Sequence, residues 1–265
     1  MPSGSGISIV STVRNEENHI RKFLDSVSGL SQPYELIIVD AESSDRTGQI
    51  ISSYGEIPDL KYVRKKCSRG EGRNIGASFA KYDYILFLDG DCEFSKGLLD
   101  SYRNILSGDY DIVAGSTELS GSQKFSKLKR VPLYLKGFEV TSPSSNLCYA
   151  RSLFNSLGGF NPEYVTAEDI DLNIRAMRSG ARATTCSECI VTAFTRQNTA
   201  SFLSQAFWNG YGRGQLRIMQ KDSWDQIVRG ERFGSGFSLA NILRLSWAFS
   251  GYFYALLKRG RYPDR

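Results

Sequence analysis

One short stretch constrains the fold of this chain more than any other. Residues 84–88 (Tyr-Ile-Leu-Phe-Leu) form an apolar run of aromatic and branched side chains, which is typical of a strand buried on both faces. The run ends at Asp89-Gly90-Asp91, two carboxylates separated by one glycine. In an open α/β sheet the carboxyl ends of the strands border the ligand crevice, so both acids are expected at a site rather than in a core.

The two acids have two interpretations. Asp-Gly is common in turns, and this stretch taken alone favours a plain turn. Two carboxylates this close also repel each other unless a positive charge lies beside them. A hard divalent cation would supply that charge, because magnesium-type ions are usually held by one or two carboxylates plus substrate oxygens. The neighbouring stretches favour the second interpretation.

The first 91 residues predict a parallel, doubly wound sheet. Three more strands are expected at residues 7–13, 36–39 and 61–63, and helical segments separate them. This alternation gives an α/β fold with a Rossmann-like, mostly parallel central sheet flanked by helices, and its turns point at one crevice.

Two helix starts are expected after the first two strands. We expect Asn15 to cap the first helix with Glu16 and Glu17 in its first turn, and Ser43 or Ser44 to begin the second helix. The buried stripe of the first helix is expected at the spacing of Ile20, Phe23, Leu24 and Val27.

Asp40 ends the second strand, at the same topological place as Asp89. An acid there is well placed to accept hydrogen bonds from the base or ribose of a nucleotide. The alternative is a cap for the next helix, although Asp45 or the serines could fill that role.

A glycine-rich stretch, residues 69–76, precedes the strand at 84–88. Glycines let a backbone approach a phosphate, a helix start attracts anions, and Arg73 could add a bidentate contact. The spacing is neither the Rossmann fingerprint nor a Walker loop.

An acidic stretch follows at residues 166–172. Thr166 and Asp169 have the spacing of a helix-capping box, so Asp169 is either a capping acid or a general base beside the crevice. The buried face of this helix is expected at Ile170, Ile174 and Met177. Its polar face is expected at Glu168, Asp171, Arg175 and Arg178.

Charge and cysteine content limit the function further. Lys and Arg outnumber Asp and Glu by 33 to 28, a net charge of +5 that is too small to indicate nucleic-acid binding. Five cysteines, an odd number, are typical of reduced thiols in a cytosolic protein. Cys186 and Cys189 form a CxxC without a second pair or a histidine, so we expect a structural role and no zinc site. No secretory signal is expected, because the first residues lack a basic region followed by an apolar one.

The C-terminal third is helical and basic in part. Residues 199–220 predict a partial helix interrupted by Gly210, Gly212 and Gly214. Residues 237–257 are apolar except for a few polar positions, with Arg244 in the middle and basic residues after them. This pattern favours a helix lying in the lipid headgroup region over a membrane span, and a helix docked on the domain is the alternative.

A basic cluster lies in the middle of the chain, at Lys124, Lys127, Lys129 and Arg130. It is either a solvated face or a surface that attracts a phosphorylated acceptor or a membrane.

Taken together, six stretches resemble the family 2 inverting glycosyltransferases with a GT-A fold. They are residues 7–16, which end in Asn15-Glu16, and residues 39–45, 73–76, 86–91, 158–160 and 167–169. They occur in the family's order with familiar spacing, and the resemblance covers about residues 6–215. It implies a GT-A fold with a C-terminal helical appendage and a sugar transfer from a nucleotide diphosphate donor.

The resemblance implies roles for the donor-binding residues. Asp40 would hold the nucleobase beside the backbone of Thr12, Val13 and Arg14. Glu16 belongs to the same donor-binding set. Arg73 would lie along the base or diphosphate. Asp89, with Gly90, would meet the ribose.

It also implies the catalytic groups. Asp91 would bind Mg2+ or Mn2+, which neutralises the diphosphate leaving group. Asp169 would remove the proton of the acceptor hydroxyl, so that attack inverts the anomeric centre, and Glu168 would help to orient it.

The chain departs from the family pattern in two ways. No histidine follows the strand that ends near residues 193–194, and the single histidine, His19, is expected on the first helix. Metal binding would then depend on Asp91 and the diphosphate. The Gln-x-x-Arg-Trp motif of processive enzymes is absent around Gln205 and Arg213, which favours a single sugar addition.

The leading hypothesis is a metal-dependent glycosyltransferase that acts on a glycan or lipid-linked acceptor and is peripheral at the cytoplasmic membrane face. The alternatives are a non-catalytic nucleotide-sugar-binding protein and, on the sheet alone, a nicotinamide dehydrogenase. The expected organisation is a flexible tail (1–6), a nucleotide-sugar-binding half (7–115), an acceptor-binding and catalytic half (116–220) and a C-terminal helical segment (221–265).

Overall fold

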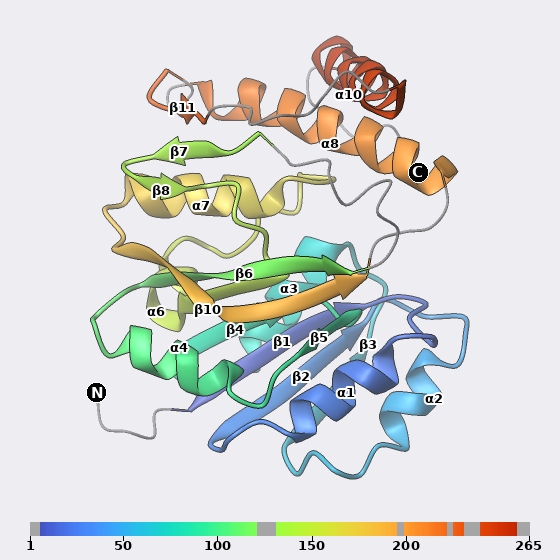
Figure 1. Ribbon diagram of the computed structural model, residues 1–265, viewed down its shortest axis with the longest axis vertical. Helices are drawn as coiled ribbons and strands as arrows, with labels where there is room; N and C mark the ends of the chain where they lie inside the picture. Colours follow the sequence, from blue (N-terminus) through green and yellow to red (C-terminus); the bar gives the residue numbers. More distant parts are fainter. Residues whose placement is uncertain (1–5, 121–130, 195–198, 222–224, 231–238, 259–265) are drawn as a thin grey trace. The chain divides into compact units, whose positions relative to one another are not determined.

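The computed structural model describes residues 6–120, 131–194, 199–221, 225–230 and 239–258 (Figure 1). The chain forms two compact units. The first unit comprises residues 1–119, 143–160 and 178–194, and the second comprises residues 120–142, 161–177 and 195–265. The organisation expected from the sequence, with halves at 7–115 and 116–220, stays a prediction.

The first unit is built on an eight-stranded sheet with the strand order β3-β2-β1-β4-β9-β6-β10-β5. The strands are β1 (Ile7–Val13), β2 (Tyr34–Asp40), β3 (Leu60–Arg64), β4 (Tyr84–Leu88), β5 (Cys92–Phe94), β6 (Ile112–Ser120), β9 (Asn146–Ala150) and β10 (Ala183–Phe194). β1 pairs in parallel with β2 and β4, and β2 with β3. β9 runs antiparallel to both β4 and β6, and β10 runs antiparallel to β5. The four strands predicted in the first 91 residues are therefore confirmed, and their carboxyl ends share one edge of the sheet.

Helices cover both faces of this sheet. The helices of the first unit are α1 (Ile20–Ser28), α2 (Thr47–Ser52), α3 (Arg69–Ser78), α4 (Leu98–Leu106) and α6 (Arg151–Ser156). Buried side chains of α1, α2 and α4 join those of Ile9, Leu36 and Leu86 in one apolar core. α3 packs on the opposite face, against Val10 and Thr12 of β1 (Figure 1). Alternate residues of β1 thus point to the two helical layers.

Both predicted helix starts after β1 and β2 are wrong. α1 begins at Ile20 and has no acid in its first turn, although its buried stripe is as predicted. α2 begins at Thr47 rather than at Ser43 or Ser44. The polar side chains of the two loops bond to each other instead: the Asn15 Oδ1 accepts a hydrogen bond from the Ser44 N–H at 2.9 Å. The polar side chains expected to cap these helices therefore make contacts between the two loops instead.

The glycine-rich stretch was expected to lead into a helix, and it is itself helical from its first residue. Ser68 and Glu71 form a capping box, so α3 begins at Arg69 and includes the glycines. A Cβ atom on Gly72 would lie 2.5 Å from the Thr12 Cγ2, and one on Gly76 would lie 2.4 Å from the Val10 Cγ1. These glycines allow the helix to lie directly against the sheet.

One pair of cysteines differs from the expected reduced thiols. Cys186 and Cys189 of β10 form a disulfide, with Cα atoms 5.3 Å apart, and both residues are buried. Cys67, Cys92 and Cys148 are free. An odd number of cysteines means that at least one thiol has no disulfide partner within the chain, but it does not exclude one disulfide between two neighbouring cysteines.

In its described residues, the second unit contains a small sheet and three helices. The strands β7 (Leu133–Leu135), β8 (Phe138–Glu139) and β11 (Val228–Arg229) are antiparallel in the order β11-β7-β8. The helices are α7 (Glu168–Arg178), α8 (Thr199–Met219) and α10 (Leu239–Leu257). α8 is continuous over 21 residues, so the prediction that its glycines interrupt it is wrong.

The glycines of α8 serve helix packing instead. α8 and α10 lie side by side (Figure 1). A Cβ atom on Gly210 would lie 1.8 Å from the Ala248 carbonyl oxygen, and one on Gly251 would lie 2.0 Å from the Phe207 carbonyl oxygen. The two backbones are therefore in near-direct contact, as the docked-helix alternative for residues 237–257 expects.

The other side of α10 is apolar and exposed. Its exposed large apolar residues are Ile242, Leu243, Trp247, Phe249, Phe253, Leu256 and Leu257. Within the described part of the chain, no helix combines the length and apolar character that a membrane crossing requires. The basic cluster at residues 124–130 lies outside the described residues.

Candidate active site

The loops after β1 and β2 form a single edge, called here the carboxyl edge (residues 12–19, 40–47 and 89–91). Val13 and Asp40 are register partners in the parallel pair. Beyond them, the Asn15 N–H donates to the Ser43 Oγ at 2.9 Å and the Glu16 N–H donates to the Thr47 Oγ1 at 2.7 Å. The backbone of one loop is therefore held by side chains of the other.

Asp40 is buried in the carboxyl edge, with only 1% of its surface exposed. Its Oδ1 accepts the Ser43 N–H at 2.7 Å, and its Oδ2 accepts the Tyr62 hydroxyl at 2.7 Å. Burial and this hydrogen bond raise the pKa of Tyr62 to about 12. Asp40 therefore closes the turn after β2 rather than capping α2.

The expected neighbours of Asp40 differ in exposure. Val13 is buried and Arg14 is exposed. The Thr12 Oγ1 is buried without a hydrogen-bond partner among the described residues, and it faces Gly72 of α3. These three positions bring backbone, a cation and an unsatisfied hydroxyl to the end of β1.

Arg73 and Asp89 form an ion pair inside the first unit. The Arg73 Nη2 lies 2.8 Å from the Asp89 Oδ1, and the side chain of Arg73 is 2% exposed while that of Asp89 is 31% exposed. The guanidinium carbon lies 5.5 Å from the centre of the Phe160 ring. Arg73 is thus enclosed between a carboxylate and an aromatic face, which fixes Asp89 at the end of β4.

A second contact joins the same two regions of sequence. The Asn74 Nδ2 donates to the Phe160 carbonyl at 2.7 Å, and the Phe160 N–H donates to the Asn74 Oδ1 at 2.8 Å. Gly158 and Gly159 reach this position with φ of 74° and 71°, a conformation that favours glycine. The stretches at 73–76 and 158–160 are therefore one structure, a pairing that the sequence did not reveal.

Three carboxylates interact at the ends of β1 and β4. Burial, and then the charge of Asp89, raises the pKa of Asp91. Burial, and then the charge of Asp91, raises the pKa of Glu16. The His19 Nδ1 lies 3.3 Å from the Glu16 Oε2, at the residue that precedes α1 rather than on the helix. The charge balance at this place favours a cation.

Gly90 holds the two acids against β1. A Cβ atom on it would lie 2.5 Å from the Val13 Cγ1. Within the described residues, no three His, Cys, Asp or Glu side chains are grouped to hold a metal ion. One or two carboxylates are sufficient for a magnesium-type ion when substrate oxygens complete its shell, so Asp91 and its neighbours fit such an ion with a diphosphate present.

The acidic stretch lies in the second unit, where two predictions for α7 are wrong. The helix begins at Glu168, so Ala167 rather than Thr166 occupies the position before it. Ala167 has a φ of 67°, which costs about 1–3 kcal/mol for a non-glycine residue. The expected buried face is correct, but Glu168 and Asp171, expected on the polar face, are also buried.

Pairing explains the burial of Asp171. The Arg175 Nε donates to the Asp171 Oδ2 at 2.8 Å, and the Gln220 Nε2 donates to the Asp171 Oδ1 at 2.7 Å. A buried carboxylate is tolerated when it is paired and hydrogen-bonded. Asp169 is half-buried, and its Oδ1 accepts the Ile170 N–H at 2.8 Å. Asp169 is thus more accessible than Glu168 and Asp171, the other two acids in the first turn of α7.

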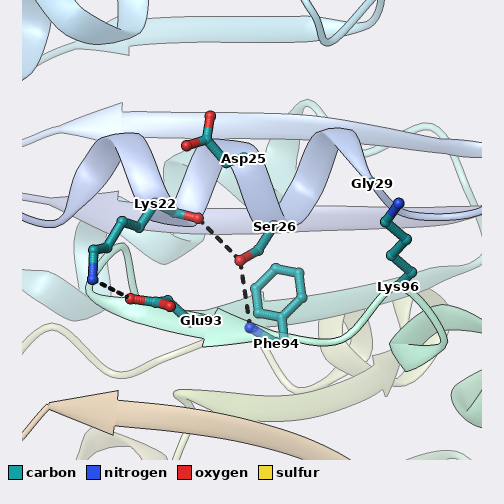
Figure 2. Close-up of a pocket in the computed structure, with 7 residues that line it drawn as sticks. All are labelled: Lys22, Asp25, Ser26, Gly29, Glu93, Phe94 and Lys96. Carbon is teal, nitrogen blue, oxygen red and sulfur yellow. Dashed lines mark hydrogen bonds and ion pairs between the residues drawn. The ribbon is translucent and has the colours of Figure 1, made fainter.

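A shallow hollow between α1 and β5 lies away from these residues (Figure 2). The Lys22 Nζ lies 3.0 Å from the Glu93 Oε1 across it, and the Ser26 Oγ accepts the Phe94 N–H at 3.5 Å. It shares no residue with the predicted site, and two pairs of its lining residues bond across it. We assign it to the packing of α1 on β5.

Comparison with known proteins identifies the family. The family model described as Glycosyl transferase family 2 matches residues 8–155, more than half of the chain. The chain belongs to glycosyl transferase family 2. The resemblance to this family noted in the sequence is therefore confirmed.

Two relatives match most of the chain at low sequence identity. It is 22% identical to the dolichyl N-acetyl-alpha-D-glucosaminyl phosphate 3-beta-D-2,3-diacetamido-2,3-dideoxy-beta-D-glucuronosyltransferase of Methanococcus voltae, over 95% of this chain and 85% of the relative. It is 24% identical to Glycosyltransferase AglE of Haloferax volcanii, over 82% of this chain and 75% of the relative.

Solved structures confirm the predicted GT-A fold of this glycosyltransferase. S. aureus TarS 1–349 in complex with UDP-GlcNAc matches with a TM-score of 0.65 at 21% identity, over 81% of this chain and 66% of TarS 1–349. The mannosyltransferase PcManGT of Pyrobaculum calidifontis, in complex with GDP-Man and Mn2+, matches with a TM-score of 0.67 at 14% identity, over 97% of this chain and 76% of that protein.

Proposed function

We propose that this glycosyltransferase moves one sugar from a nucleoside-diphosphate sugar to an acceptor hydroxyl, with inversion at the anomeric carbon and with Mg2+ or Mn2+ bound. The observation that carries the proposal is the carboxyl edge, where Glu16, Asp40, Asp89 and Asp91 meet at the ends of β1, β2 and β4. Burial and neighbouring negative charge raise the pKa of Glu16 and Asp91, and a cation on a diphosphate would offset that charge.

The donor would lie along the carboxyl edge. Asp40 would accept from the base beside Thr12, Val13 and Arg14. Asp89 and Gly90 would meet the ribose. Arg73, expected beside the base or diphosphate, would act by holding Asp89, because its guanidinium is enclosed in that pair.

Asp91 would hold the metal ion with the diphosphate oxygens, and Glu16 and His19 lie close enough to contribute to its electrostatic environment. When bound, the ion stabilises negative charge on the leaving diphosphate. The Mn2+ in the mannosyltransferase structure supports this choice of ion.

Asp169 would be the general base. A half-buried carboxylate at a helix start can accept the proton of the acceptor hydroxyl while that oxygen attacks the anomeric carbon. The C–O bond to the diphosphate breaks on the opposite side, which inverts the centre. Glu168, buried beside it, would orient the carboxylate or the acceptor.

The acceptor would be a glycan or a lipid-linked sugar at the cytoplasmic membrane face. The name of the Methanococcus relative contains a dolichyl phosphate acceptor, which supports a lipid-linked one. The exposed apolar side of α10 would contact the headgroup region, with Lys258 near lipid phosphates.

The deciding experiment measures nucleoside diphosphate release and sugar transfer from UDP- and GDP-sugars with Mg2+ or Mn2+. Asp91→Ala and Asp169→Ala should each lower kcat by about 100-fold or more. Asp83→Ala, at a carboxylate that is 85% exposed, is the matched control. Near-normal rates in either site variant would remove the role assigned to that residue.

A further inference from the structure

Helix α8 presents glycines on two opposite sides. Gly210 and Gly214 face α10, where a Cβ atom on Gly214 would lie 2.6 Å from the Ala255 Cβ. Gly212 faces the other way: a Cβ atom on it would lie 2.8 Å from both the Thr166 Cγ2 and the Thr166 carbonyl oxygen. Residues two apart in a helix point to opposite sides, so one helix contacts both α10 and the segment before α7.

A side chain of α8 holds the same segment. Gln215 is fully buried. Its Nε2 donates to the Glu163 carbonyl at 3.2 Å, and its Oε1 accepts the Val165 N–H at 3.4 Å. Its amide thus bonds two backbone groups of this segment.

The segment held in this way, residues 163–167, leads directly into the acidic pair at the start of α7. It ends at Ala167, whose φ of 67° is rare for a residue with a side chain. Such a conformation persists only where the surroundings impose it. Gly212 contacts Ala167 as well, since a Cβ atom on Gly212 would lie 3.0 Å from the Ala167 Cβ.

We propose that Gly212 and Gln215 are positioning residues, which fix the 163–167 segment and so set the place of the Asp169 carboxylate at the start of α7. The proposal rests on the function proposed above for Asp169. Neither residue touches substrate. Gly212 acts by allowing α8 to approach, and Gln215 acts by holding the backbone of the segment.

The kinetic test uses Gln215→Leu, which keeps the side-chain volume but loses both hydrogen bonds, and Gly212→Ala. We expect kcat for nucleoside diphosphate release from UDP-GlcNAc or GDP-mannose with Mn2+ to fall about 10- to 100-fold, because a small misplacement of a catalytic group has effects of this size. The KM of the donor should change less than about twofold, since the donor residues lie on the carboxyl edge.

Gly97→Ala is the matched control for the glycine, because a Cβ atom there meets open space and its φ is −81°. It should leave both constants unchanged. An unchanged kcat in Gln215→Leu and Gly212→Ala, or a raised KM with normal kcat, would overturn the positioning role.

A double-variant cycle separates this proposal from the function on which it rests. In an Asp169→Asn background, Gln215→Leu should cause no further loss, because residues that act through one group are non-additive. Full additivity contradicts positioning through Asp169. Normal activity of Asp169→Asn alone instead removes the proposed base, whatever Gln215 does.

Amide hydrogen exchange provides a readout that needs no activity. In Gln215→Leu, exchange at residues 163–169 should accelerate at least tenfold while the interior of α8 keeps its protection. Unchanged exchange in that segment overturns the proposal even if neither donor is turned over. If Gly212→Ala does not fold, Gln215→Leu alone decides.

Discussion

Arg73 is a large cation with almost no access to water, and its surroundings explain why it is tolerated. Its guanidinium pairs with Asp89 and lies over the ring of Phe160. Removing one member of a buried pair leaves the other charge uncompensated, and here that charge lies next to Asp91. The pair therefore links the stability of the first unit to the position of two acids.

Arg73→Met should lower the free energy of unfolding by about 3 kcal/mol, measured by urea denaturation, because Asp89 loses its partner while remaining partly buried. Arg46→Met removes an exposed arginine that pairs with Glu17 at 3.2 Å, and it should cost less than about 1 kcal/mol. Equal losses in the two variants would contradict the distinction.

Asp91→Asn should raise the thermal midpoint at pH 7 in the presence of a chelator. Burial and Asp89 raise the pKa of Asp91 above its ordinary 3.8, so the folded protein binds the proton more tightly than the unfolded chain. Stability contributed by this group is then present at low pH and is lost as pH rises above about 4. The gain from Asp91→Asn should shrink towards pH 4, and a variant less stable at pH 7 would contradict it.

The sequence predicted the single residues of the site better than their contacts. Asp40, Asp89 and Asp91 were expected at strand ends because apolar runs fix where strands stop. The pairing of Arg73 with Asp89 and Phe160 was not predictable, since position 160 is distant along the chain and only packing brings it near. Asp171 was placed on a polar face because a pattern does not show that Arg175 and Gln220 compensate its charge.

At the scale of elements, the start of α3 is marked by a capping box that the sequence analysis overlooked. The Ser68 Oγ accepts the Glu71 N–H at 3.3 Å, and the Glu71 carboxylate accepts the Ser68 N–H at 2.7 Å. This pattern was present in the sequence, but the glycines after it suggested a loop. Strands were predicted well because burial alone defines them, whereas helix starts depend on which partner each polar side chain chooses.

Ser68→Ala should lower the free energy of unfolding by about 1 kcal/mol through loss of the cap. The backbone hydrogen bond from Ser68 lowers the pKa of Glu71, so its contribution is present above its ordinary pKa of 4.5 and is lost as pH falls below it. The difference between wild type and Glu71→Gln should therefore shrink in acid. Ser107→Ala, at the end of α4, is the control and should have little effect at either pH.

At the scale of the whole molecule, α10 has two unlike sides. One side packs on α8 through Gly251, and the other exposes large apolar residues. Its packing on α8 was one of two readings left open by the sequence, because an apolar run with one arginine fits both a docked helix and a headgroup helix. In the structure, one side of α10 packs on α8, and the exposed apolar side remains compatible with a helix in the headgroup region.

The full chain should bind vesicles that contain anionic lipid, measured by sedimentation, and deletion of residues 237–265 should weaken binding. Trp247→Ser with Phe253→Ser removes two exposed aromatic side chains and should lower partitioning at least tenfold, since each buried side chain contributes about 1.5–3 kcal/mol. Phe79→Ser, at an exposed phenylalanine directly after α3, is the matched control. Equal partitioning of all variants would refute membrane binding through α10.

The alternating glycines of α8 have a consequence for mutational tolerance. Positions 210, 212 and 214 each meet neighbouring atoms within 2.8 Å of where a side chain would begin, on alternating sides of the helix. A saturation scan of α8 should therefore show intolerance at every second residue along this stretch. That rhythm is normally the mark of an extended strand, and here it would arise from a helix enclosed on both flanks.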